Sequence, residues 1–302
     1  MMMPDRLLAF YFQKVLKAAS MLPPPLAYKI LPATGHLFRK WDVYSAGVDE
    51  PGILFRAEHN LKHIGLFSDH NIKQIINNNL RFESRVVTEK YWIRERNKSK
   101  ILNSFNASDL TLFQNLLEKN TCVIVSAHVA GIFMLLALPD LIHHNTLVIR
   151  GNPLTHSWKH LNPFIMHSIE TVKIWKEYQP FIFMDEGDMM NKSRAALSSG
   201  TNVLICPDLP GFSQGVQVNF FNQQVVVPVG AVKLARDADV PILITIPWAF
   251  TCTESHRLYL KIIHPEDINE GMTTIMESIE SVIKLNPACW AGWMYIDRML
   301  AA

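Results

Sequence analysis

The second half of the chain alternates between short apolar runs and longer stretches with apolar residues at helical spacing. Apolar runs of roughly four to eight residues between turn residues are typical of buried strands, whereas helical spacing indicates a helix with one buried face. Short runs predict strands at residues 122–126, 146–149, 181–184, 202–205, 216–221, 242–246 and 258–263. Helices are predicted between them at residues 131–138, 158–176, 188–197, 231–237 and 265–285. This alternation predicts an α/β fold with a mostly parallel sheet flanked by helices.

The first part of the chain is predicted to be helical. Helical spacing recurs at residues 26–41, 54–64 and 71–94, and the aromatic-rich segment 287–300 predicts a last helix that packs back on the body. At 302 residues the chain suits one large domain with a helical extension. We therefore predict an amphipathic helical extension over residues 1–45 and one α/β domain over residues 46–302.

Residues 1–45 are more basic than the rest of the chain. They hold six basic and two acidic side chains, a net charge of +4, which leaves −2 for the remaining residues. The apolar run Leu7–Phe12 is far shorter than the roughly 20 residues of a membrane-spanning helix, and no small-residue cleavage site follows it. A basic amphipathic helix suits anionic lipid headgroups, and a helix packed on the domain's own core has the same pattern. The first interpretation predicts a cytoplasmic protein that is peripheral on the inner membrane face.

Composition and cysteine spacing exclude several classes of function. Apolar residues make up 49% and charged residues 19% of the chain, as in folded globular proteins. The net charge of +2, without runs of like charge, gives no signal for nucleic-acid binding. The four cysteines lie far apart without a CxxC pair, and neither a Walker loop nor a dinucleotide fingerprint is present. The sequence therefore predicts reduced thiols, no metal site and no cofactor.

His128 is the most informative candidate for chemistry. It follows the predicted strand 122–126 and precedes the small residues Ala130 and Gly131, which open the next predicted helix. Ligands of open α/β sheets bind at the carboxyl ends of the strands, so a histidine at this place faces the expected crevice. An isolated histidine elsewhere is more often a buried structural group, and it is the position at a strand end that favours catalysis.

Two further strand ends carry acidic residues. Asp208 lies in a Gly- and Pro-rich loop after a predicted strand, where it could orient a base, bind an acceptor or only cap the turn. Asp185 and Glu186 follow another predicted strand, and Lys192 and Arg194 lie on the helix after it. These four residues are candidates for substrate binding, with a phosphate as the group that the bases would face. Acids at a helix N-terminus and solvated bases on a helix have the same pattern.

Several short segments follow one another along nearly the whole chain in the order that is found in a known protein family. These segments are Asn60–Lys62, the helix that ends near Glu89, Ser126–Gly131, Ser198–Gly200, Pro207–Asp208, Asn219–Phe221, Pro228–Gly230, Leu234–Ala235 and Asn286–Trp290. Together they resemble the lipid A late acyltransferase family, within the lysophospholipid acyltransferase superfamily. The resemblance implies acyl transfer, without a metal, from a thioester on acyl carrier protein or coenzyme A to a hydroxyl or amine acceptor. His128 would be the general base that takes the acceptor's proton.

The chain departs from the family pattern at Phe133. The family pairs its histidine with a Glu or Asp five positions later, an acid that fixes the tautomer and stabilises the imidazolium, and that position here is Phe133. In one interpretation another acid, Asp208, Asp185 or Glu186, replaces it. In a second, His128 works without an acid on an easier reaction. In a third, the protein binds acyl chains or a partner without catalysis.

The remaining alternatives differ in the group that accepts the acyl chain. A thioesterase, in which water takes the acceptor's place, fits the same residues, whereas the absence of a G-x-S-x-G elbow argues against a serine hydrolase. His128 and Asp208 are both present in a well-formed frame, which favours active transfer. The altered dyad favours an acceptor other than standard lipid A, in specialised lipid or natural-product biosynthesis.

Overall fold

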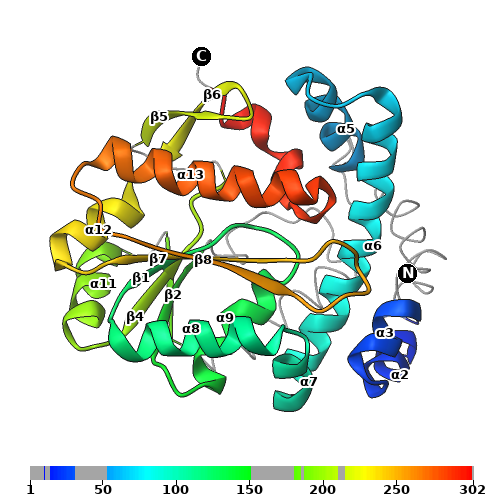
Figure 1. Cartoon of the computed structure of the whole chain (residues 1–302), viewed down its shortest axis with the longest axis horizontal. Coiled ribbons are helices and arrows are strands. Elements are labelled where there is room, and N and C mark those ends of the chain that lie inside the picture. The colour runs from blue at the N-terminus through cyan, green and yellow to red at the C-terminus, as the bar shows by residue number, and fades with distance from the viewer. Residues whose placement is uncertain are drawn as a thin grey trace.

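The computed structural model describes residues 10, 14–30, 53–150, 180–184, 187–209 and 215–300, and its centre is a six-stranded sheet between two helical layers (Figure 1). The strands of this sheet are β1 (Val123–Val125), β2 (Thr146–Arg150), β3 (Phe181–Phe183), β4 (Asn202–Ile205), β7 (Ile242–Trp248) and β8 (Arg257–Ile263). Their order is β3-β2-β4-β1-β7-β8, and every neighbouring pair is parallel except β7 and β8. The predicted α/β class with a mostly parallel sheet is confirmed.

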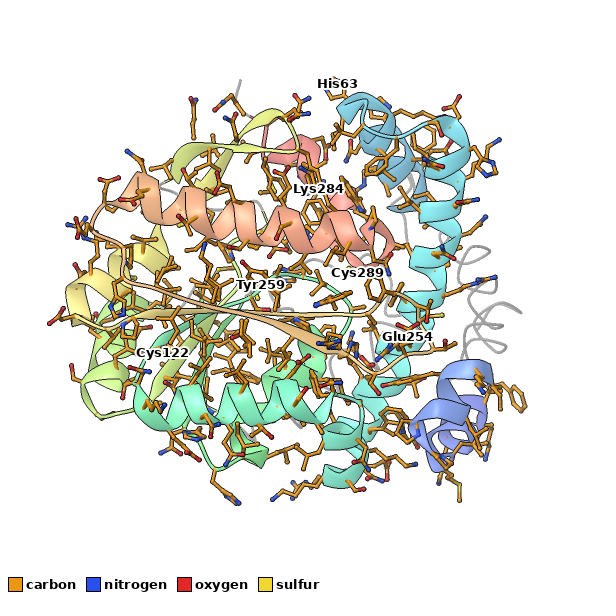
Figure 2. The ribbon with its side chains drawn as sticks, viewed as in Figure 1. His63, Cys122, Glu254, Tyr259, Lys284 and Cys289 are labelled. Carbon is orange, nitrogen blue, oxygen red and sulfur yellow. The ribbon has the colours of Figure 1, made fainter. Side chains whose placement is uncertain are left out.

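Helices cover both faces of the sheet (Figure 1). The described helices of the body are α5 (Ile53–Ile64), α6 (Asp69–Arg94), α7 (Lys98–Asn103), α8 (Ala107–Lys119), α9 (Ile132–Leu141), α11 (Met189–Ser198), α12 (Gly230–Ala238) and α13 (Ile268–Leu285). Strand β1 alternates its side chains, so that Val123 and Val125 pack toward α12 and α13 while Ile124 packs toward α8 and α9. Figure 2 shows side chains filling the layer between α13 and the sheet. The predicted helix at residues 158–176 lies outside the described residues.

The N-terminal helices α2 (Leu16–Met21) and α3 (Pro24–Ile30) lie beside α6. Their buried contacts come from Ala19, Ala27 and Tyr28, while Met21 is exposed. The later part of the predicted helix 26–41 lies outside the described residues. Among the helices that the structure describes, none combines the length and the apolar character needed to cross a membrane.

A hairpin of β5 (Gly215–Phe220) and β6 (Gln223–Pro228) forms a second, antiparallel sheet. Strand β6 was not predicted, because its apolar run, Val225–Val227, is only three residues long and lies between two glutamines and Pro228. Phe221 and Asn222 form the two-residue turn with φ of 53° and 59°, the left-handed conformation that tight hairpins require. The amide of Phe221 donates to Glu280 Oε2 at 2.8 Å, which ties this turn to α13.

The C-terminal segment differs from the predicted single helix. It forms three short 3-10 turns at Pro287–Cys289, Ala291–Met294 and Ile296–Arg298. The backbone becomes extended at Trp290, with φ −97° and ψ 126°, where it pairs with Val129 in an isolated bridge. The helical hydrogen-bond pattern is broken because this segment bonds to the loop after β1 instead. The aromatic residues of the segment nevertheless pack on the body, as predicted: Trp290 and Trp293 are buried.

Candidate active site

Parallel pairing of β1 with β4 brings His128 and Asp208 together. The register pairs Val125 with Ile205, the last residues of the two strands. His128 and Asp208 each follow their strand by three residues. Because neighbouring parallel strands end at the same edge of a sheet, the two side chains meet there although they are 80 residues apart in sequence.

The Asp208 carboxylate accepts three hydrogen bonds from residues that the structure describes. Its Oδ1 lies 2.8 Å from His128 Nδ1, and its Oδ2 accepts from the His128 amide at 2.7 Å and from Trp290 Nε1 at 2.8 Å. The side chain is fully buried. Burial by itself raises the pKa of the Asp208 carboxyl, but the charge and hydrogen bonds of His128 and the Trp290 indole outweigh it and hold this pKa below its ordinary value. Asp208 is therefore ionised at neutral pH.

An ionised Asp208 determines which nitrogen of His128 carries the proton. A carboxylate is an acceptor only, so Nδ1 of the neutral ring must be protonated to bond to Asp208 Oδ1. This tautomer leaves the lone pair on Nε2, and the His128 side chain is 37% exposed while that of Asp208 is 0% exposed. The pair can thus take a proton from a group that approaches from solvent, with the resulting imidazolium stabilised by the buried acid.

The C-terminal turns form one wall of the site. Ala130 N donates to Cys289 O at 2.7 Å, and Ala291 N donates to His128 O at 2.9 Å, so the His128 loop is bonded on both sides of Trp290. Asn79 of α6 donates to Ala288 O at 2.9 Å and holds the first turn in place. The hydrogen bond from Trp290 to Asp208 was not predicted, since the sequence indicated only packing for the C-terminal aromatic residues.

Two motif segments of the sequence support the same wall. Asn60 of α5 is buried and donates to Trp293 O at 2.8 Å and to Asp297 Oδ1 at 2.9 Å. The rings of Phe220 and Phe221 pack on Trp290, with centroids 5.4 and 6.0 Å away. Phe220 and Phe221 thus pack directly on the indole that bonds to Asp208, and Asn60 holds the turn of Trp293, whose ring packs on Trp290 with centroids 4.7 Å apart.

Phe133 is half-buried on α9 and takes part in hydrophobic packing. Its ring contacts both helical layers, and Lys90 Nζ lies 4.1 Å from its centroid. The acid that contacts His128 is Asp208, which is the first of the acids considered from sequence. The other two, Asp185 and Glu186, lie outside the described residues.

Cys206 lies beside the dyad. His128, Cys206 and Asp208 each have a potential ligand atom within 4.8 Å of the others, which is a spacing that a metal could use. Burial and the Asp208 carboxylate both raise the pKa of the Cys206 thiol well above its usual range. Metal ligation needs the thiolate, and both oxygens of Asp208 are already bonded to donors. The donor set therefore fits a histidine–carboxylate dyad better than a metal centre.

The two predicted basic residues lie on α11. Arg194 forms an ion pair with Asp237 of α12, with Nη2 to Oδ2 at 2.6 Å, and it also donates to Asn191 Oδ1 at 2.7 Å. Lys192 is exposed on the same helix. The described contacts of Arg194 thus join two helices, and a substrate-binding role for either base stays a prediction.

Comparison with known proteins covers almost the whole chain. The model of the family described as bacterial lipid A biosynthesis acyltransferase matches residues 1–299, a range that includes both strands and both loops of the dyad. No curated protein matches the chain.

Proposed function

Because this chain belongs to the bacterial lipid A biosynthesis acyltransferase family, we propose that it transfers an acyl group from a thioester to a hydroxyl or amine acceptor, with His128 as the general base. The donor would be an acyl carrier protein or coenzyme A thioester. The observation that carries the proposal is the hydrogen bond of His128 Nδ1 to the buried, ionised Asp208 at 2.8 Å, with the other ring nitrogen left for the acceptor.

The reaction can be written with the proton followed through each step. His128 Nε2 takes the proton of the acceptor while its oxygen or nitrogen attacks the thioester carbonyl carbon. The tetrahedral intermediate then collapses, the carbon–sulfur bond breaks, and the leaving thiolate takes the proton back from Nε2. Asp208 keeps its hydrogen bond to Nδ1–H throughout and stabilises the imidazolium between the two steps.

We also propose peripheral contact with a membrane through α2 and α3. These helices expose Met21 (77%), Leu26 (49%) and Ile30 (52%), and the exposed bases Lys17 and Lys29 lie on the same two helices. Apolar side chains flanked by bases suit the boundary between acyl chains and anionic headgroups. Such contact would bring the site to a lipid acceptor or to an acyl donor held near the surface.

The test combines donors, acceptors and two matched variants. Purified protein would be incubated with acyl-carrier-protein and coenzyme A thioesters and a panel of lipid, alcohol and amine acceptors, with acyl products followed by mass spectrometry. We expect acceptor-dependent product in the wild type, its loss in His128→Ala, and its retention in His264→Ala, which changes an exposed histidine after β8. Free acid that forms without an acceptor would indicate a thioesterase. Acyl binding without turnover, unchanged in His128→Ala, would overturn the catalytic proposal.

A further inference from the structure

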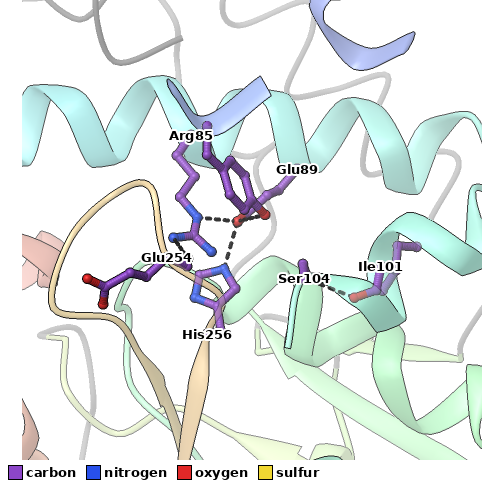
Figure 3. A network of polar contacts seen from close by, with 7 residues as sticks. Arg85, Glu89, Ile101, Ser104, Glu254 and His256 are labelled. Carbon is purple, nitrogen blue, oxygen red and sulfur yellow. Dashed lines mark hydrogen bonds and ion pairs between the residues drawn. The ribbon is translucent and has the colours of Figure 1, made fainter. Parts of the chain in front are cut away.

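A second histidine, His256, lies in a buried polar cluster that the dyad does not include (Figure 3). Three donors converge on one oxygen of Glu89: Tyr28 Oη at 2.8 Å, Arg85 Nε at 2.6 Å and His256 Nε2 at 2.7 Å. All four side chains are buried, and they come from α3, from α6 and from the residue before β8. The cluster therefore fixes the place of His256 from two separate helices.

The backbone of His256 is also held by hydrogen bonds. Its amide donates to Ser104 O at 2.7 Å, and its carbonyl accepts from Asn106 N at 2.8 Å, so the residue is clamped at the junction of α7 and α8. Glu89 is an ionised acceptor, because the nearby His256 and Arg85 lower its pKa to about 2 despite the burial that acts to raise it. His256 Nε2 must then carry the proton that bonds to Glu89.

The His256 ring also lies against the turn that follows His128. A Cβ added to Gly131 would lie 2.6 Å from Cε1 and 2.7 Å from Nδ1 of His256, closer than side-chain atoms approach one another. Gly131 also has φ of +95°, a conformation that glycine adopts without strain. Among the described residues, His256 Nδ1 has no hydrogen-bond partner. The ring thus acts on Gly131 by its shape rather than by a hydrogen bond.

The turn that carries His128 is held between two walls. On one side are the hydrogen bonds of Ala130 and His128 to the segment around Trp290, and on the other is the His256 ring against Gly131. Gly131 O accepts the Leu135 amide at 2.9 Å in the first turn of α9, so a shift of Gly131 would move both the helix start and the histidine three residues before it.

We propose that His256, oriented by Glu89, Arg85 and Tyr28, is a positioning residue that holds the His128 turn in register with Asp208. This inference rests on the proposed catalytic role of His128 but concerns a different residue. Several polar atoms of this buried cluster lack hydrogen-bond partners among the described residues, which is costly. A positioning role for His256 gives a reason for keeping the cluster buried despite that cost. Because catalytic groups must be placed to within a fraction of an ångström, loss of this wall should lower kcat more than it changes KM.

The test compares two variants that disturb the contact from opposite sides. His256→Gln keeps a side-chain N–H for Glu89 but removes the ring that faces Gly131. Gly131→Ala drives a methyl group into the ring and also strains the backbone at its positive φ. In protein labelled with ¹⁵N-histidine, the Nδ1–H proton of His128, assigned with His128→Ala, reports its bond to Asp208 without any turnover. We expect this signal to shift or broaden in both variants, with kcat at least tenfold lower and KM within threefold of the wild type. Phe113→Leu, which truncates a buried ring of α8, should leave the signal in place.

The outcomes separate this inference from the proposed function. A wild type without acyl transfer, but with the His128 signal displaced in both variants, would remove the function and keep the positioning role. Folded His256→Gln and Gly131→Ala proteins with an unmoved signal and kcat within twofold of the wild type would overturn the inference. A further check is Gly131→Ala in the His256→Ala background, where the methyl group no longer meets the ring. The strain of the positive φ remains in both backgrounds, so only the part of the defect that comes from the clash should disappear, and the combined defect should be smaller than the product of the two single defects.

Discussion

Replacing Asp208 by asparagine tests how the dyad works. The three partners of the carboxylate among the described residues are all donors, whereas an asparagine side chain offers one oxygen and one NH₂ group. If the new oxygen faces His128 Nδ1, the NH₂ group meets the His128 amide and the Trp290 indole, and two buried donors lose their acceptor. If it faces those two donors, all three contacts survive, but the NH₂ group donates to Nδ1 and the proton of the ring must move to Nε2.

The second arrangement is the more stable one, because an unsatisfied buried donor costs about 1–3 kcal/mol and the first arrangement creates two of them. It places the proton on Nε2, the nitrogen that the proposed mechanism uses as the base. We therefore expect Asp208→Asn to fold, with a free energy of unfolding lower by about 1–3 kcal/mol because hydrogen bonds to a charged acceptor are lost. We expect kcat to fall by a factor of about 10⁴, which is the size of the effect of a wrong histidine tautomer in a catalytic triad. Urea unfolding and acyl-transfer kinetics measure the two quantities. A folded variant with kcat within tenfold of the wild type would refute the assigned tautomer.

Three further results are expected. Trp290→Phe keeps an aromatic ring packed on Phe220 and Phe221 but removes the Nε1–H that helps to lower the pKa of Asp208. Urea unfolding should show a free energy of unfolding lower by about 1.5–3 kcal/mol, and kcat should fall. Unchanged stability would contradict this expectation. Glu89 has a pKa of about 2 against an ordinary 4.5, so its ionised form contributes about 3 kcal/mol to stability above pH 4.5, and this contribution is lost as the pH falls toward 2. The free energy of unfolding, measured as a function of pH, should therefore change less between pH 4.5 and 2 in Glu89→Gln than in the wild type. The double variant Met21→Asp/Ile30→Asp should bind anionic vesicles at least about tenfold more weakly in co-sedimentation, whereas Leu112→Asp on α8 should bind like the wild type.

The strands of the main sheet and most of the helices could be predicted because their signals are local. Apolar runs such as Val123–Val125 are buried on both faces, and their length and boundaries are visible in the sequence. Strand β6 was missed because its apolar run is only three residues long, whereas the turns after Pro287 could not be predicted because they are determined by contacts with distant residues. Trp290, for example, bonds across the fold to Asp208.

The candidate site also has parts that the sequence could predict and parts that it could not. The positions of His128 and Asp208 at strand ends are local facts, and parallel pairing of their strands then explains the contact between them. Which of three acids would reach His128 depended on strand order, which the sequence did not determine. His256 carried no signal at all, since its partners Glu89 and Gly131 lie more than a hundred residues away and only the folded chain brings them together.

A double-mutant cycle on the dyad tests the central claim most directly. Acyl transfer would be measured for the wild type, His128→Ala, Asp208→Asn and the combined variant, with urea unfolding to establish that each is folded. If Asp208 acts only through the His128 ring, the combined variant should be no slower than His128→Ala alone, because residues that act as a unit are not additive. Losses that multiply across the cycle, or a His128→Ala protein as active as the wild type, would contradict the account of His128 and Asp208 as one catalytic pair.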